Sequence, residues 1–203
     1  MPTARCGTVQ TKGVSHCDRN NMWTHYLAAA NGANTQVLSL DQAPDGRIWV
    51  GGYGMDVYAI SKADRSVMRL PKGPADSGLT TKYVFRVLCE GDNVWIGGIQ
   101  GDVVRYNTRT ASYRRFNPSC IADMATDGAG TVFVGGCDGV GIYRPEADSV
   151  AIYMTLDTIS FTHPMRTFAY DGRRSELWIA SDGDGIMRYT PSTGAIRRFD
   201  FNG

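Results

Sequence analysis

Acidic side chains recur in the glycine-rich turns of this chain, where pairs of carboxylates could serve in acid–base chemistry or bind the hydroxyl groups of a ligand. Asp182 and Asp184 alternate with glycines, and Asp138 precedes another glycine. Glycosidases need two carboxyl groups at a set separation, which the sequence alone does not give. The three histidines, His16, His25 and His163, form no cluster in the sequence, and no Ser–His–Asp arrangement is present. We therefore predict no catalytic residue and no metal site.

One sequence pattern repeats four times, and its strands must position these turns. The anchors of the pattern are W-V-G-G at 49–52, W-I-G-G at 95–98, F-V-G-G at 133–136 and W-I-A-S at 178–181. Successive anchors begin 46, 38 and 45 residues apart. Periods of this size are typical of stacked supersecondary units, so the repeat indicates the fold before any single residue does.

Each repeat predicts four antiparallel strands joined by short turns. The first is an apolar run such as 37–40, and the anchor is the second. An Asp-Gly turn such as 44–46 joins them, because glycine supplies positive φ and aspartate bonds its own backbone. A second glycine-rich turn leads to a third strand that ends on an aromatic, such as Tyr58, and residues 68–70 form a short fourth strand. Four such strands make one blade of a β-propeller.

The predicted fold class is all-β, a single β-propeller spanning residues 1–203. Full blades are expected at 37–70, 84–116, 120–153 and 165–199, and a partial blade at 8–26 supplies the second to fourth strands of a fifth. A blade buries both faces against its neighbours, so about four and a half blades leave apolar faces open. We expect a fragment of a longer propeller; a closed five-bladed ring is the alternative.

The turns between second and third strands hold the candidate ligand-binding residues. Antiparallel strands reverse direction at each step, so these turns lie on the same face as the connections into each first strand, around the mouth of the central channel. Polar residues there differ from blade to blade between constant flanking residues. The candidates are Tyr53, Asp56, Lys82, Gln100, Asp102, Asp138, His163, Asp182 and Asp184.

The large aromatic residues of the anchors have a different predicted role. Trp49, Trp95, Phe133 and Trp178 share one register in the second strand. Sugar-binding sites favour aromatics, but large side chains at a fixed register in repeats usually fill the space between units. We interpret these four as structural wedges, and the glycines that follow them as turn formers that supply unusual φ angles.

Composition excludes several classes of function. A net charge of +1 gives no field that would favour nucleic acid or an anionic membrane, so we predict no nucleic-acid partner. Five cysteines lack the spacing of zinc or thioredoxin motifs, and their odd number disfavours a full disulfide framework, although one bridge between neighbouring strands stays open. Residues 1–6 lack the apolar run that is typical of a signal peptide, and no stretch has the length of a membrane span.

The repeat resembles the two-component regulator propeller family. The resemblance covers residues 8–199 and is strongest at 40–58 and 177–189, with I-W-V-G-G and G-x-x-V-Y elements; Phe133 and Ala180-Ser181 depart from it. It implies the sensor region of a hybrid two-component system, in which seven-bladed propellers precede a β-sandwich, a membrane helix and a histidine kinase. It further implies a periplasmic or extracellular location and an oligosaccharide ligand.

The expected function is therefore that of a non-catalytic sensor propeller that recognises an oligosaccharide or transmits its binding to a kinase. The expected partners are the remaining blades, the β-sandwich and the kinase of the parent protein; a homodimer stays open, and no cofactor is predicted. Two alternatives remain, a propeller lyase or glycoside-active enzyme and a protein-binding scaffold. The same fold hosts all three, so the fold does not choose between them.

Overall fold

The computed structural model describes residues 7–10, 13–27, 36–70, 79, 81, 83–100 and 102–199, and these form five antiparallel sheets. The first sheet has three strands, β1 (Gly7–Gln10), β2 (Gly13–Cys17) and β3 (Trp23–Tyr26). The second contains β4 (Gln36–Gln42), β5 (Ile48–Tyr53), β6 (Val57–Ile60) and β7 (Val67–Leu70). The third contains β8 (Tyr83–Glu90), β9 (Asn93–Ile99), β10 (Asp102–Asn107) and β11 (Ser112–Ser119).

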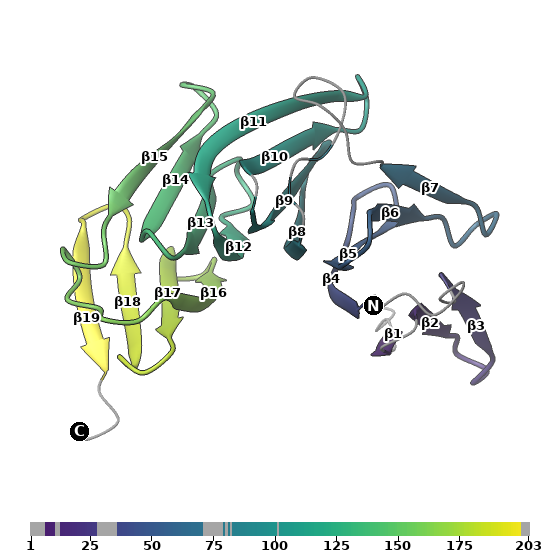
Figure 1. The fold of residues 1–203 in the computed structure, drawn as a ribbon, viewed down its shortest axis with the longest axis horizontal. Helices are drawn as coiled ribbons and strands as arrows, with labels where there is room; N and C mark the ends of the chain where they lie inside the picture. Colours follow the sequence, from purple (N-terminus) through teal and green to yellow (C-terminus); the bar gives the residue numbers. More distant parts are fainter. Residues whose placement is uncertain are drawn as a thin grey trace.

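The last two sheets repeat the same order of strands. One contains β12 (Ile121–Thr126), β13 (Val132–Gly136), β14 (Val140–Arg144) and β15 (Ser149–Met154). The other contains β16 (Met165–Asp171), β17 (Glu176–Ser181), β18 (Ile186–Thr190) and β19 (Ala195–Phe199). In Figure 1 the five sheets follow one another along an arc, with β4, β8, β12 and β16 on its inner side. The predicted all-β propeller fold is confirmed.

Within the described residues no helix is long and apolar enough to cross a membrane.

The hairpin turns between first and second strands close on aspartate side chains. Asp45 accepts the Arg47 amide at 2.9 Å, and Asp127 accepts the amides of Ala129 and Thr131 at 2.8 and 3.0 Å. Gly46 has a φ of 86° in the first of these turns. In each turn the aspartate accepts backbone amides, and the glycine after it adopts a positive φ. These two properties explain why the Asp-Gly pairs predicted these hairpins.

Each first strand carries a β-bulge at the same place. The pairing to the second strand shifts register between Val37 and Ser39, and it does so again in the next three sheets. A bulge leaves its extra residue unpaired and re-aims that side chain. The bulged residues are Leu38, Phe85, Ala122 and Arg166.

The bulge explains the second glycine of each Gly-Gly anchor. A Cβ built on Gly52 would lie 1.8 Å from the carbonyl oxygen of Gln36, and one on Gly98 would lie 1.7 Å from that of Tyr83. None of the anchor glycines has a positive φ. Their interpretation as turn formers is therefore wrong: the backbone beside the bulge occupies the space that a side chain would need.

The first glycine of each anchor makes room for the next sheet. A Cβ on Gly97 would lie 2.9 Å from Ile121 Cγ2, and one on Gly135 would lie 2.0 Å from the Phe168 ring. Trp49 and Trp95 are 0% and 1% exposed and pack in the apolar layers between successive sheets. The core is thus a series of layers, each shared by two neighbouring blades.

Candidate functional site

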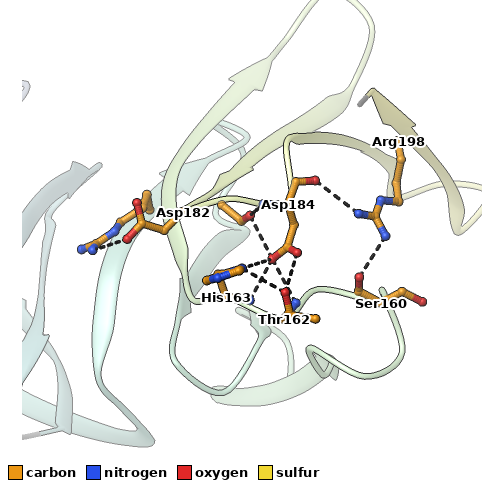
Figure 2. Close-up of polar contacts among 8 residues, drawn as sticks. Ser160, Thr162, His163, Asp182, Asp184 and Arg198 are labelled. Carbon is orange, nitrogen blue, oxygen red and sulfur yellow. Dashed lines mark hydrogen bonds and ion pairs between the residues drawn. The ribbon is translucent and has the colours of Figure 1, made fainter. Parts of the chain in front are cut away.

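Asp184 joins the turn after β17 to the connection that leads into β16. Its carboxylate accepts the Thr162 amide at 2.9 Å, the Thr162 hydroxyl at 2.8 Å and the His163 amide at 2.8 Å. The Ser181 hydroxyl donates to the same carboxylate at 3.2 Å. Figure 2 shows these bonds converging on one side chain, beside the bonds from Arg198 to the carbonyl oxygens of Ser160 and Asp184.

This hydrogen bonding determines the charge state of Asp184. Burial acts to raise the pKa of the carboxyl group, but the hydrogen bonds from Thr162, His163 and Ser181 outweigh it and hold the pKa well below its usual value. A carboxylate with several donors stays ionised at neutral pH. Asp184 therefore fixes the geometry of the turn, and four hydrogen bonds from the turn and the connection already engage its carboxylate.

Arg166, Asp182 and His163 form the exposed part of this cluster. Arg166 Nη2 donates to Asp182 Oδ2 at 2.6 Å, and the two side chains are 60% and 55% exposed. His163 is 54% exposed, and its Nδ1 lies 3.3 Å from Asp184 Oδ2. The hydrogen bond and the charge of Arg166 lower the pKa of Asp182. The three side chains present a cation, an anion and an imidazole to solvent from the β16 bulge, the turn after β17 and the connection before β16 respectively.

A second polar group continues this cluster across three blades. Asp123 Oδ2 accepts the Thr167 hydroxyl and the Phe168 amide, both at 2.8 Å. Asp123 Oδ1 lies 3.1 Å from Arg86 Nε, which also donates to the Met124 carbonyl oxygen at 3.3 Å. Arg86, Asp123 and Thr167 each follow the bulged residue of an inner strand. We name these three residues the inner belt.

Tyr53 lies at the junction of the second and third sheets. Its ring stacks on that of Tyr83 with centroids 4.4 Å apart and an interplanar angle of 9°, and Tyr53 is 41% exposed. Strand pairing gives Tyr53 and Asp182 equivalent positions, each one residue beyond the anchor. Tyr53 therefore offers an aromatic surface where the last blade offers Arg166 and Asp182.

The other predicted candidates are placed as follows. Asp56 is bound by Arg69 at 2.5 Å, and the carbonyl oxygen of Asp102 accepts the Thr81 hydroxyl at 2.8 Å. Gln100 is exposed with a φ of 58°, and Asp138 is exposed. Lys82 lies outside the described residues. The structure thus brings His163, Asp182 and Asp184 together, and it places the other described candidates, Tyr53, Asp56, Gln100, Asp102 and Asp138, on other blades.

A disulfide joins Cys120 to Cys137. It joins the residue before β12 to the turn after β13, and the Cys137 amide also donates to the Cys120 carbonyl oxygen at 3.2 Å. Cys137 has the same position in its blade as Tyr53 and Asp182 in theirs. A covalent bond therefore fixes one of the turns on the candidate face.

Two functional candidates, Arg166 and the Arg86–Asp123 pair, were not predicted from the sequence. They lie in the first strands, which were predicted only as apolar strands that open each repeat. Their signal in the sequence is a charged residue inside an otherwise apolar strand.

Within the described part of the chain, no three His, Cys, Asp or Glu side chains are grouped so that they could hold a metal ion.

Neither a protein-family model nor a curated protein sequence matches the chain. Among solved structures, it is similar to the extracellular domain of a protein described as a hybrid two component system from B. thetaiotaomicron, with a TM-score of 0.73 and 15% identity over 94% of this chain. An extracellular domain described as belonging to a one component system of the same organism has a TM-score of 0.65 and 15% identity over 95% of the chain.

PorZ, a surface component of the type-IX secretion system of Porphyromonas gingivalis, has a TM-score of 0.69 and 12% identity over 95% of the chain. The chain spans 28%, 33% and 32% of the lengths of these three structures. At such identities the likeness shows a shared β-propeller fold, which unrelated functions use.

Proposed function

We propose that this chain is part of a sensor propeller that lies outside the cytoplasm and recognises an oligosaccharide at the cluster of Arg166, Asp182 and His163. The observation that carries the proposal is the exposure of these three groups, each more than half accessible, on the turn face of one blade. An exposed cation, carboxylate and imidazole can exchange hydrogen bonds with the hydroxyl groups of a neutral, polyhydroxylated ligand.

The exposed ring of Tyr53 supports the same class of ligand. Aromatic faces bind apolar surfaces while leaving polar edges free to form hydrogen bonds. A sugar ring has an apolar face of C–H groups and a rim of hydroxyl groups. Tyr53 and Asp182 occupy equivalent turns of different blades. One extended ligand on this face would therefore meet a stacking group on one blade and hydrogen-bonding groups on another.

The acids favour binding over catalysis. A glycosidase needs one carboxylic acid with a raised pKa to protonate the leaving group. The hydrogen bond and the charge of Arg166 lower the pKa of Asp182. The hydrogen bonds that Asp184 accepts lower the pKa of Asp184 despite its burial. Neither group has the protonation state of a general acid at neutral pH.

Two observations support a location outside the cytoplasm. Disulfides persist in oxidising compartments, and the Cys120–Cys137 bond is present. Two structures of similar fold are extracellular domains.

The inner belt offers a route from the site to neighbouring blades. Thr167 follows Arg166 directly, and its hydroxyl donates to Asp123 in the neighbouring blade. Asp123 in turn pairs with Arg86 in the blade before its own. A ligand changes the state of a sensor only through differential affinity for two arrangements. We propose that a ligand on Arg166 favours one arrangement of these blades, which a kinase elsewhere in the parent protein would detect.

Isothermal titration calorimetry with a panel of neutral and acidic oligosaccharides tests this function. We expect at least one member to bind, and we expect Arg166→Met and Asp182→Asn each to weaken that binding by tenfold or more, since each removes a charge-assisted hydrogen bond. Arg173→Met, in the hairpin turn at the opposite end of β16, is the matched control. Equal affinity of all three variants would refute the assignment of the site.

A further inference from the structure

The last blade exposes an apolar face, and the equivalent face is buried in the blade of β8–β11. Strand pairing aligns Trp178, Ile186 and Phe199 with Trp95, Val103 and Phe116. Val103 is 0% exposed because the sheet of β12–β15 covers it, whereas Ile186 is 37% exposed. The same comparison aligns Arg188 and Arg197 with Arg105 and Arg114. We name the set of Trp178, Ile186, Arg188, Arg197 and Phe199 the terminal face.

The equivalent set on β8–β11 binds a tyrosine and a carboxylate of the next blade. Arg105 Nη1 donates to the Tyr143 hydroxyl at 2.5 Å and to Asp148 Oδ1 at 2.8 Å. Arg114 Nε lies 3.5 Å from the other oxygen of Asp148. Two guanidinium groups therefore bracket one carboxylate, while the Tyr143 ring packs 4.6 Å from the Trp95 ring.

On the terminal face the aromatic and arginine side chains already have the arrangement seen on β8–β11. The rings of Trp178 and Phe199 stack with centroids 5.4 Å apart at 23°, and those of Trp95 and Phe116 stack at 5.4 Å and 28°. Arg197 lies 4.9 Å above the Phe199 ring. Arg188 lies 3.4 Å from Glu176, which engages part of a guanidinium that has five N–H donors.

This arrangement is specific to two of the four complete blades. Where β8–β11 has Arg105 and Arg114, the sheet of β4–β7 has Ala59 and Met68, and that of β12–β15 has Ile142 and Ala151. General packing between blades therefore does not need the two arginines. Their presence on the terminal face indicates a particular neighbour.

The sheet of β1–β3 does not have the chemistry of that neighbour. Tyr143 lies in the third strand of its blade, and Asp148 lies in the turn that follows. In the first sheet, β2 and the turn after it contain no tyrosine. Their one carboxylate, Asp18, already accepts the amides of Asn20 and Met22 at 2.8 and 2.9 Å.

We propose that the terminal face binds one further four-stranded β-blade, outside the described residues, which presents a tyrosine hydroxyl and a carboxylate to Arg188 and Arg197 as Tyr143 and Asp148 do to Arg105 and Arg114. Ala180 has the position that Gly97 has in its blade, where a Cβ atom would lie 2.9 Å from Ile121 Cγ2 of the next blade. The bound blade therefore carries a residue smaller than isoleucine at the position of Ile121. This inference is independent of the ligand proposed above.

The test supplies such a blade to the full chain. A copy of residues 121–154 is appended after Gly203, so that residues 200–203 form a link as long as residues 117–120, and Ile121→Ala and Cys137→Ser are made in the copy. Hydrogen exchange of the amides of β18 and β19 is the readout. We expect exchange there to slow by about tenfold or more relative to the unextended chain, because burial of a face suppresses local opening.

Two matched variants test the recognition chemistry. Tyr143→Phe with Asp148→Asn in the copy alone, and Arg188→Met with Arg197→Met in the host, should each remove most of this protection. The host variant without the extension should change exchange in β18 and β19 by less than about twofold, which controls for folding. Equal protection by the original and the altered copy would overturn the proposal, as would no protection by either.

Discussion

Replacing Asp123 by alanine tests the inner belt most sharply, because this side chain joins three blades. Its carboxylate accepts the Thr167 hydroxyl and the Phe168 amide at 2.8 Å, and it lies 3.1 Å from Arg86 Nε. The Asp123 side chain is 14% exposed, and Arg86 is 32% exposed. The substitution leaves an amide, a hydroxyl and a guanidinium without their shared acceptor.

The expected loss of stability follows from these contacts. Hydrogen bonds to a charged group contribute about 1 to 1.5 kcal/mol each in partly solvated surroundings, and a partly exposed ion pair contributes about 0.5 to 1 kcal/mol. Together they predict that Asp123→Ala lowers the free energy of unfolding by about 3 kcal/mol. For a domain of this size, that corresponds to a fall in Tm of about 6 to 12 °C. Asp123→Asn keeps an acceptor oxygen and should lose about half as much.

Urea unfolding followed by circular dichroism measures these values. Asp157→Ala is the matched control, because Asp157 is exposed in the connection between β15 and β16, and it should change stability by less than about 0.5 kcal/mol. Amide exchange should also quicken in β8 and β16 of Asp123→Ala. A loss below about 1 kcal/mol, or an equal loss for Asp123→Asn, would refute the view that a shared charge holds these blades together.

Three further predictions concern the parts that support the site. Gly98→Ala should destabilise the chain by about 3 to 5 kcal/mol in urea unfolding, because the new Cβ meets a backbone oxygen, whereas Gly172→Ala, which meets nothing within 4 Å, should stay within about 1 kcal/mol. Reduction of the Cys120–Cys137 bond, with a sequence separation of 17, should lower the free energy of unfolding by about 3 kcal/mol, measured with and without reductant. The pKa of Asp184 is lowered in the folded state, so its contribution is present above the usual carboxyl value of 3.8 and lost as pH falls below it; Asp184→Asn should flatten the stability profile measured between pH 5 and 2.

The propeller fold could be predicted because its signals are local. Asp-Gly turns such as Asp45-Gly46 and the period of the tryptophan anchors specify hairpins without any long-range contact. The meaning of the Gly-Gly pairs could not be predicted. Their constraint comes from a bulged backbone one strand away and from side chains of the next blade, and neither is visible in a single segment.

The candidate site was predicted in part for the same reason. Asp182, Asp184 and His163 were found because topology alone places turns and connections on one face. Arg166 was missed because a β-bulge, which alternation of apolar residues does not reveal, turns its side chain toward Asp182. Asp123 and Arg86 were missed because they bind groups in other blades: Arg86 donates to the Met124 carbonyl oxygen 38 residues away, and Asp123 accepts the Phe168 amide 45 residues away.

Two-dimensional NMR of the ¹⁵N-labelled chain, titrated with the oligosaccharide that binds most tightly, locates the ligand on the surface of the propeller. We expect chemical-shift changes at residues 162–167 and 182–184, with smaller changes that follow the inner belt to Asp123 and Arg86. Changes confined to the opposite turns, such as 127–131 and 171–175, would contradict the proposed site.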